Sequence, residues 1–330
     1  MSQLHIGIDL GGTKTALIAL DRSGGTRANK RWATPRGDYD GTIRAIAHHV
    51  ADAESALGEK ATIGIGIPGT LSPATGLVKN ANSTWLNGRP LDLDLETALD
   101  RPVRLANDAN CFVLSEAVDG AGAGFRSVFG VILGTGIGGG LVVARSPLIG
   151  PNAIAGEWGH NPLPDAGGEP GAPRACWCGR TDCIETYLSG PGLARTHEAL
   201  GGGVAKAEDL PARAAAGDAL AAAALDRHAD QLARGLGTVV NILDPDIVVL
   251  GGGLSNLPGL ADRVAARWSD FIFSDRVDTL IRRHRHGDAS GVRGAWLWRE
   301  GVWTPRNTDR LPGREDKTDA QPVPGLHNAR

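Results

Sequence analysis

A repeated unit of strand, glycine-rich turn and strand limits what this chain can fold into more than any other feature. Residues 4–20 read as a hairpin with the turn Gly-Gly-Thr-Lys-Thr at 11–15. Residues 128–144 read as a second hairpin, whose turn at 134–140 contains five glycines. The two units match in pattern, with Gly130 standing 123 positions after Gly7. We interpret the match as a duplicated lobe in which each copy offers one hairpin to a shared ligand, but glycine hairpins are common and two of them alone do not decide the question.

Composition supports two lobes and excludes several classes of protein. A chain of 330 residues is too long for one small core. With 34 basic and 37 acidic residues it lacks the basic excess of a dedicated nucleic-acid binder. No apolar run approaches the roughly 20 residues of a membrane span, and no signal-peptide pattern precedes the first strand. We therefore expect a cytoplasmic protein that contacts neither nucleic acid nor membrane.

The remaining elements follow from periodicity. Apolar spacing and breaker residues predict helices at 40–57, 110–118, 217–239, 258–270 and 288–298, and strands at 62–67, 102–106 and 246–250. From Thr304 onward four prolines, many charges and few apolar residues predict a disordered tail.

Neither glycine turn fits a common nucleotide motif. Gly134, Gly136 and Gly139 match Gly-x-Gly-x-x-Gly, but a strand follows them instead of the helix that holds a dinucleotide pyrophosphate. We therefore exclude a dehydrogenase. The first turn lacks the Walker A spacing. Both hairpins can still present backbone N–H groups to phosphates.

Polar side chains beside the turns extend this interpretation. Thr13, Lys14 and Thr135 would add hydroxyl and ammonium contacts. Asp9, at the end of the first strand, would either hold magnesium through water or stabilise the turn.

Three of the four cysteines lie within eight residues, at Cys176, Cys178 and Cys183. In a reducing compartment such a cluster indicates a metal site before it indicates disulfides, and Cys-x-Cys pairs have poor disulfide geometry. A tetrahedral zinc site needs a fourth ligand. Cys111 stands apart on a predicted helix, and we interpret it as a core residue.

Taken in order, the motifs of this chain from about Ile6 to about Trp298 resemble those of the ROK (repressor, ORF, kinase) family of sugar kinases. The resemblance rests on Asp9-Leu-Gly-Gly-Thr-Lys, Asn107-Asp108, Leu133-Gly-Thr-Gly-Ile-Gly-Gly-Gly, Ala155-Gly-Glu-Trp-Gly-His160, Cys176-Trp-Cys-Gly-Arg-Thr-Asp-Cys-Ile-Glu185 and Leu250-Gly-Gly-Gly. Residues 80–88 and 107–111 resemble the bacterial fructokinase (manno-fructokinase) branch in particular.

This resemblance implies an α/β fold with two duplicated lobes of the actin, hexokinase and Hsp70 (ribonuclease H-like) type around a central nucleotide and sugar cleft. It places the N-terminal lobe at 1–117, joined by a C-terminal helix at 288–303. The C-terminal lobe covers 118–287 with a zinc loop at 157–185, and the tail covers 304–330. A homodimer is the family expectation.

The resemblance also implies an activity, the ATP-dependent phosphorylation of a hexose with the help of magnesium, and fructose is the expected substrate. Asp108 matches the catalytic base, although the residues alone favour a helix cap there. The implied substrate-binding residues are Asn82, Asn107, Asp108, Glu157, His160 and Glu185. The implied ATP-binding residues are Gly11, Gly12, Thr13, Lys14, Gly134, Thr135, Gly136, Gly252 and Gly253, with magnesium at Asp9. The implied ligands of a structural zinc ion are His160, Cys176, Cys178 and Cys183.

Two details of the zinc loop carry further expectations. One ring nitrogen of His160 would bind zinc while the other donates a hydrogen bond to a sugar hydroxyl. Asp182 stands where the family usually has glycine before the third cysteine. Glycine there suggests a positive φ, which Asp tolerates better than most residues, so we expect the zinc site to survive.

Three alternatives remain open. The sugar can be glucose, mannose or an N-acetylated hexosamine. The protein can be a sugar-sensing repressor, although the first hairpin begins within ten residues and leaves no room for a DNA-binding segment. It can also be an actin-like or Hsp70-like ATPase, but the zinc loop at 157–185 and the motifs of the implied sugar-binding residues disfavour that alternative.

Overall fold

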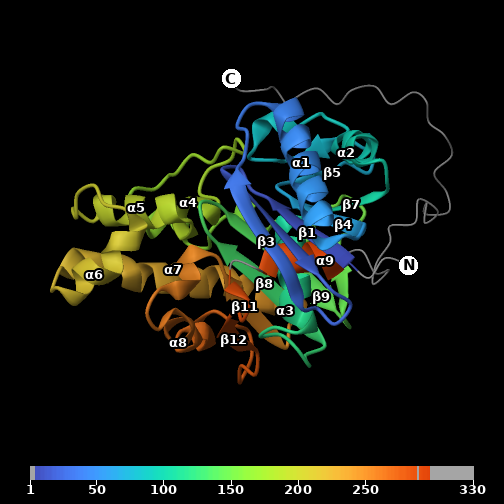
Figure 1. The fold of residues 1–330 in the computed structure, drawn as a ribbon. Helices are drawn as coiled ribbons and strands as arrows, with labels where there is room; N and C mark the ends of the chain where they lie inside the picture. Colours follow the sequence, from blue (N-terminus) through green and yellow to red (C-terminus); the bar gives the residue numbers. More distant parts are fainter. Residues whose placement is uncertain (1–3, 288–289, 298–330) are drawn as a thin grey trace, which may run out of the picture.

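The computed structural model describes residues 4–287 and 290–297, which form two five-stranded sheets with helices packed on them (Figure 1). In spatial order the first sheet consists of β3 (Thr26–Ala33), β2 (Lys14–Leu20), β1 (Leu4–Leu10), β4 (Ala61–Ile67) and β7 (Val103–Asn107). The second sheet consists of β10 (Ser146–Leu148), β9 (Ile137–Val143), β8 (Ser127–Leu133), β11 (Ile247–Gly251) and β12 (Leu280–Arg283).

The two sheets have the same order and the same strand directions. β1 is antiparallel to β2 and parallel to β4. In the same way, β8 is antiparallel to β9 and parallel to β11. The duplicated α/β architecture expected from the two glycine hairpins is therefore confirmed. A small two-stranded sheet of β5 (Thr70–Leu71) and β6 (Val78–Lys79) projects from the first lobe.

Helices cover both sheets and fill the space between them. The helices are α1 (Tyr39–Leu57), α2 (Leu91–Leu99), α3 (Asp108–Val118), α4 (Glu185–Leu188), α5 (Gly190–Ala199), α6 (Leu210–Ala215), α7 (Ala219–Leu243), α8 (Leu260–Ala265) and α9 (Ser290–Leu297). α3 packs on β8 and β9 of the second sheet, while α9 packs on α3 and on β1 and β4 of the first (Figure 1). This pair of helices joins the two lobes.

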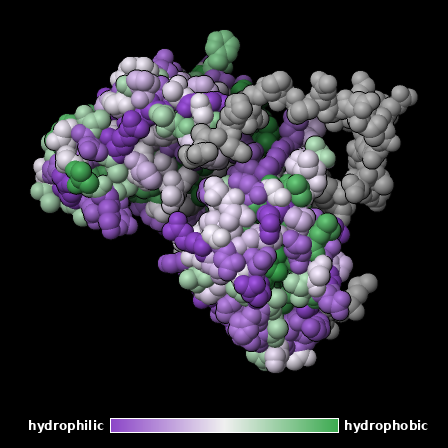
Figure 2. Space-filling view, turned by 90° about the horizontal axis from the view of Figure 1, so that it is seen from above, coloured by the Kyte–Doolittle hydropathy of each residue, from purple (hydrophilic) through white to green (hydrophobic). Residues whose placement is uncertain are grey.

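The central strands are buried on both faces because helices lie on each side of the sheets. Ile8 of β1 and Ile65 of β4 are fully buried in the core of the first lobe, and Val248 of β11 is fully buried in the second. α1 begins where the Asp38 side chain accepts from the Gly41 N–H and ends at Gly58, which adopts a φ of 69°. Figure 2 shows a mainly hydrophilic face on which apolar side chains are scattered and not gathered.

One predicted turn is wrong in extent. The turn expected at 134–140 ends early, because β9 begins at Ile137 and Gly140 pairs with Gly130 of β8. These glycines serve close packing. A Cβ on Gly139 would lie 2.6 Å from Cδ1 of Trp158, and one on Gly140 would lie 2.7 Å from Cγ1 of Val113.

Other boundaries differ by a few residues. α3 begins at Asp108 and not at 110, and α7 extends to Leu243. The helix expected at 258–270 is instead the short α8 followed by a separate 3₁₀ turn at Trp268–Asp270. The strand β3 escaped prediction because its side chains alternate between exposed and half-buried and include few apolar residues.

Parts of the C-terminal expectation lie outside the described residues, namely 288–289 and 298–303 of the predicted helix segment and the tail at 304–330. Among the helices within 4–287 and 290–297, none combines the length and apolar character needed to cross a membrane.

Candidate active site

A cavity of about 250 Å³ collects most of the side chains that the sequence singled out. It lies where β4 and β7 of the first lobe end. Opposite these strand ends lie the β8–β9 hairpin and the loop at 157–185 of the second lobe, which we call the cysteine loop. The polar residues that line it are Asn80, Asn82, Asn107, Asp108, Thr135, Glu157, His160 and Glu185. The structure thus places all the expected sugar-binding residues around one space.

Asn107 and Asp108 divide two tasks that the sequence assigned to Asp108 alone. Asn107 is the N-cap of α3, because its Oδ1 accepts hydrogen bonds from the N–H groups of Ala109 (3.0 Å) and Asn110 (3.2 Å). The Asn107 Nδ2–H donates to the carbonyl of Gly69 and to Oδ1 of Asp108, each at 3.1 Å. The capping role predicted for Asp108 therefore belongs to its neighbour, which leaves the Asp108 carboxylate at the cavity wall.

Burial of Asp108 raises the pKa of its carboxyl group to about 6, against the opposing effect of hydrogen bonds from Ala109, from its own N–H and from Asn107. The carboxylate is thus largely ionised at neutral pH but more basic than an exposed Asp. A general base works best when its pKa lies near the working pH. The side chain has the protonation behaviour that a proton acceptor needs.

Two glutamates face the same cavity. Burial, followed by the charges of Asp108 and Glu185, raises the pKa of Glu157. The Glu185 carboxylate is held at both oxygens, since Oε2 accepts from the N–H of Ile137 at 2.8 Å and Oε1 accepts from Nε1–H of Trp177 at 2.6 Å. Two carboxylates in one cavity, one of them held at both oxygens, suit a ligand with several hydroxyl groups.

The cysteine loop brings the four predicted zinc ligands together. His160, Cys176, Cys178 and Cys183 place their ligand atoms within 4.8 Å of one another. Nδ1 of His160 lies 3.6 Å from Sγ of Cys176, and the sulfurs of Cys178 and Cys183 are also 3.6 Å apart. Ligands at the usual 2.0–2.3 Å from zinc in a tetrahedron are separated by about 3.6–3.8 Å, so the donor set fits this metal. The residue His160 also lines the cavity.

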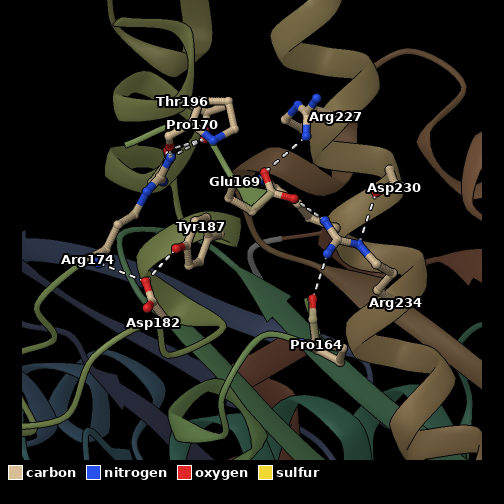
Figure 3. Close-up of polar contacts among 12 residues, drawn as sticks. Pro164, Glu169, Pro170, Arg174, Asp182, Tyr187, Thr196, Arg227, Asp230 and Arg234 are labelled. Atoms are coloured by element: carbon tan, nitrogen blue, oxygen red, sulfur yellow. Dashed lines mark hydrogen bonds and ion pairs between the residues drawn. The ribbon is translucent and has the colours of Figure 1, made fainter. Parts of the chain in front are cut away.

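A buried polar network anchors this loop, and the sequence did not predict it (Figure 3). Asp182 adopts the positive φ expected of it, at 56°. Its Oδ1 accepts from the N–H of Arg174 at 2.7 Å and from the hydroxyl of Tyr187 at 2.5 Å, contacts that a glycine cannot make. The fully buried Arg174 guanidinium donates to the carbonyls of Pro170, Thr186 and Gly192 and to Oγ1 of Thr196.

A second part of the network ties the loop to α7. The buried carboxylate of Glu169 pairs with Arg234 and, at 3.4 Å, with Arg227 (Figure 3). It also accepts from Nε2–H of Gln231 at 2.7 Å. The loop is therefore held by a separate set of ion pairs in addition to a fitting metal site.

Only some of the residues predicted to bind nucleotide line a cavity. A second cavity of about 800 Å³ adjoins the first and shares Gly134 and Thr135 with it, and Gly253 also lines this second cavity. Gly252, by contrast, has a φ of 77°, and a Cβ there would lie 2.5 Å from the carbonyl oxygen of Leu133. Close packing between the ends of two strands thus requires glycine at this position.

The two glycine turns use some of their own donors. The Gly11 N–H donates to the carbonyl of Lys14 at 3.1 Å, and the Gly134 N–H donates to that of Gly136 at 3.0 Å. Thr13 and Lys14 are exposed, and Gly12 is half-buried. The N–H groups of Gly11 and Gly134 thus close the two turns.

Asp9 is half-buried at the end of β1, where it pairs with Ala16 of β2 and with Gly66 of β4. Gly291 of α9 faces it, since a Cβ on Gly291 would lie 3.2 Å from Oδ2 of Asp9. A carboxylate at this place fits the oxygen preference of magnesium.

Sequence reasoning missed Trp177 as a site residue. The side chain lines the cavity, donates to Glu185 and meets the His160 ring edge to face, with centroids 5.0 Å apart. Its position between two zinc-type cysteines was the one available signal, and nothing in the local pattern indicated where the ring would point.

Two matched lobes with a polar cavity between them define a protein of the actin and hexokinase class. A profile of the ROK family matches residues 5–301, and this chain therefore belongs to the ROK family. The resemblance drawn from the motifs is confirmed.

Named relatives refine the comparison. N-acetyl-D-glucosamine kinase from Shigella flexneri serotype 5b (strain 8401) is 43% identical over 296 residues, which cover 88% of this chain and 98% of the relative. The ROK hexokinase of Thermus thermophilus superposes with a TM-score of 0.77 at 32% identity and covers 89% and 97% of the two chains. A ROK family glucokinase from Streptomyces griseus, solved with glucose and AMPPNP, gives a TM-score of 0.74 at 27% identity and covers 89% and 98%.

These three relatives are sugar kinases, and none of the three is a fructokinase. The comparisons therefore do not support the fructokinase branch expected from residues 80–88 and 107–111. They agree better with the alternative of an N-acetylated hexosamine.

Proposed function

We propose that this protein transfers the γ-phosphoryl group of ATP to the 6-hydroxyl of an N-acetylated hexosamine, with N-acetyl-D-glucosamine as the substrate. One observation carries the proposal. Asp108, whose pKa is raised to about 6 by burial, shares a single cavity with Glu157, His160, Glu185 and the turn of the β8–β9 hairpin. The choice of sugar is supported by the relatives named N-acetyl-D-glucosamine kinase.

In this proposal the sugar occupies the cavity of about 250 Å³. The Asp108 carboxylate accepts the proton of the attacking hydroxyl, and Asn107 holds that carboxylate in place. Glu157, His160 and Glu185 bind other hydroxyls, together with Asn82. Catalysis of phosphoryl transfer depends mainly on such positioning and on charge stabilisation.

The nucleotide would lie along the second lobe, with its phosphates also facing the first. Its phosphates would face the glycine turns near Gly12 and Gly136, and its adenosine would enter the cavity of about 800 Å³ near Gly253. Thr13, Lys14 and Thr135 would contact the phosphates. Asp9 would hold magnesium, which when bound neutralises charge on the phosphates.

Sugar-dependent release of ADP from magnesium-ATP tests the proposal. We expect strong release with N-acetylglucosamine and weaker release with glucose, mannose and fructose. The matched variant Asp108→Asn should keep the fold and bind sugar but lose turnover by about a hundredfold or more, because the proton acceptor is gone.

Near-normal turnover of Asp108→Asn would remove Asp108 from the role of base. Release with fructose alone would keep the mechanism and refute the proposed substrate. ATP hydrolysis that no sugar stimulates would refute the kinase itself.

A further inference from the structure

Trp177 is a large apolar side chain in an unusual place. It stands between two cysteines of the zinc-type cluster and is 61% exposed, whereas Trp side chains are on average highly buried. Its ring nevertheless has a defined position. Nε1–H donates to Oε1 of Glu185 at 2.6 Å, and the ring packs edge to face on His160 at an interplanar angle of 85°.

The hydrogen bond from Trp177 fixes a carboxylate that the proposed reaction uses. Glu185 begins α4, and its other oxygen accepts from the backbone of Ile137 in β9. With one donor on each oxygen, the plane of the carboxylate is set, and the remaining lone pairs are directed elsewhere. Hydrogen bonds to an ionised acceptor are strong, so loss of the indole N–H would release one side of Glu185.

Trp177 also borders two spaces. It lines the cavity that contains Asp108, and it lines a neighbouring cavity of about 860 Å³. Asn80, Glu157 and His160 border both spaces, but Asp108 borders only the first. The larger cavity thus adjoins the first at residues other than Asp108, and its wall includes the apolar residues Ile154, Val239, Ile242 and Leu243.

The geometry of the sugar ring relates these two cavities to the choice of substrate. In a hexopyranose, C2 lies across the ring from C5, the carbon that carries C6. A sugar with its 6-hydroxyl at Asp108 therefore directs its C2 substituent away from Asp108, toward the wall formed by Trp177 and the larger cavity behind it. A hydroxyl at C2 needs little room there, whereas an acetamido group needs space and an apolar surface for its methyl group.

We propose that Trp177 is a specificity-determining residue, which orients Glu185 and supplies the apolar wall for the acetamido group of the sugar. This inference rests on the proposed function and goes beyond it, because it assigns the choice between an N-acetylated hexosamine and a plain hexose to one side chain.

Steady-state kinetics with N-acetylglucosamine and with glucose test the inference in three proteins. Trp177→Phe keeps an aromatic ring and removes the indole N–H, and we expect KM to rise about tenfold for both sugars while kcat stays within about twofold. Trp177→Ala removes the wall as well. We expect kcat/KM for N-acetylglucosamine, divided by kcat/KM for glucose, to be several-fold lower in Trp177→Ala than in the wild type.

Phe273→Ala serves as the matched control, because Phe273 is a fully exposed aromatic residue that lines neither cavity. Its kinetics should equal those of the wild type. Zinc content and melting temperature, measured for each variant, separate specificity from folding.

An unchanged sugar ratio in Trp177→Ala, at wild-type zinc content, would overturn the inference while the proposed function stands. Equal losses of kcat for both sugars together with loss of zinc would also overturn it, because Trp177 would then only support the loop. If the wild type releases ADP with no sugar at all, the proposed function itself fails.

Discussion

At Asp108, the environment that makes ionisation costly is also the one that suits proton transfer. The carboxylate accepts the N–H of Ala109 at 2.8 Å and the amide of Asn107, yet burial outweighs both and raises its pKa. Asn107 takes the N-cap role of α3, which leaves Asp108 available for its proposed role as base. Two adjacent residues with short polar side chains thus serve different purposes.

The raised pKa of Asp108 predicts an acidic limb in the pH profile. The base must be ionised to accept a proton, and its ionised fraction falls as pH drops through about 6. We expect kcat/KM to be level above pH 7 and to fall about tenfold per pH unit well below 6, measured at saturating magnesium-ATP.

An Asp at its ordinary pKa would keep kcat/KM level to below pH 5. Such a flat profile would contradict the assignment. The residual activity of Asp108→Asn provides the control, since it should lack this limb.

At the scale of elements, the cysteine loop is held in two independent ways. Four ligand atoms converge on a space that fits zinc, and Arg174 with Asp182 and Tyr187 forms a buried network beside it. The guanidinium of Arg174 also stacks on the ring of Tyr187, 4.0 Å from its centroid. Glu185 and Trp177 depend on this loop for their positions.

We predict that Asp182→Gly destabilises the protein by about 1–3 kcal/mol, because the backbone N–H of Arg174 and the hydroxyl of Tyr187 lose their shared acceptor. Glycine accepts the φ of 56° without strain, so zinc content should not change. Denaturant unfolding and metal analysis measure the two effects.

Asp244→Gly is the matched control. Asp244 also has a positive φ, at 42°, but it ends α7 on the exposed surface. Its replacement should leave stability nearly unchanged. Equal stability of Asp182→Gly and wild type would show that the network contributes little.

At the scale of the whole molecule, the two lobes meet through α3 and α9. α9 is the last described element of the chain, yet it packs on β1 and β4, which belong to the first lobe (Figure 1). The contact with α3 is close. A Cβ on Gly294 would lie 1.6 Å from the carbonyl oxygen of Cys111. The absence of a side chain at Gly294 therefore sets how closely these two helices approach.

We predict that Gly294→Ala lowers the free energy of unfolding by at least about 2 kcal/mol, although alanine favours helices by about 1 kcal/mol over glycine. The clash is with backbone, which cannot rotate away. Thermal and denaturant unfolding measure the change, and Gly167→Ala is the control, because a Cβ there meets nothing within 4 Å.

A gain in stability for Gly294→Ala would mean that α9 can shift away from α3 at no cost. The lobes would then be joined less closely than the packing indicates. The position of the helix would have to be set by other contacts.

The sequence predicted much of the fold. The two glycine hairpins identified the duplication because a strand, a turn and a strand are determined by neighbouring residues. The four zinc-type ligands were identified in part by the spacing of Cys176, Cys178 and Cys183 and in part by family resemblance for His160. The positive φ of Asp182 followed from the glycine usual at that position.

Only the tertiary structure decided the features that depend on distant partners. Gly139 and Gly140 look like turn residues, but Trp158 and Val113 press against them and leave room only for strand glycines. An arginine is usually exposed, yet Arg174 is fully buried. Its guanidinium donates to backbone carbonyls, among them that of Pro170.

The site shows the same division. The sequence motifs, with the family resemblance they carry, determined which carboxylates the chain brings to its cavity and which thiols cluster in its loop. The sequence by itself did not determine that Asn107 caps α3, that burial raises the pKa of Asp108, or that Trp177 turns toward Glu185. Those properties arise from burial and from hydrogen bonds between segments far apart in the chain, and such contacts exist only once the lobes have packed.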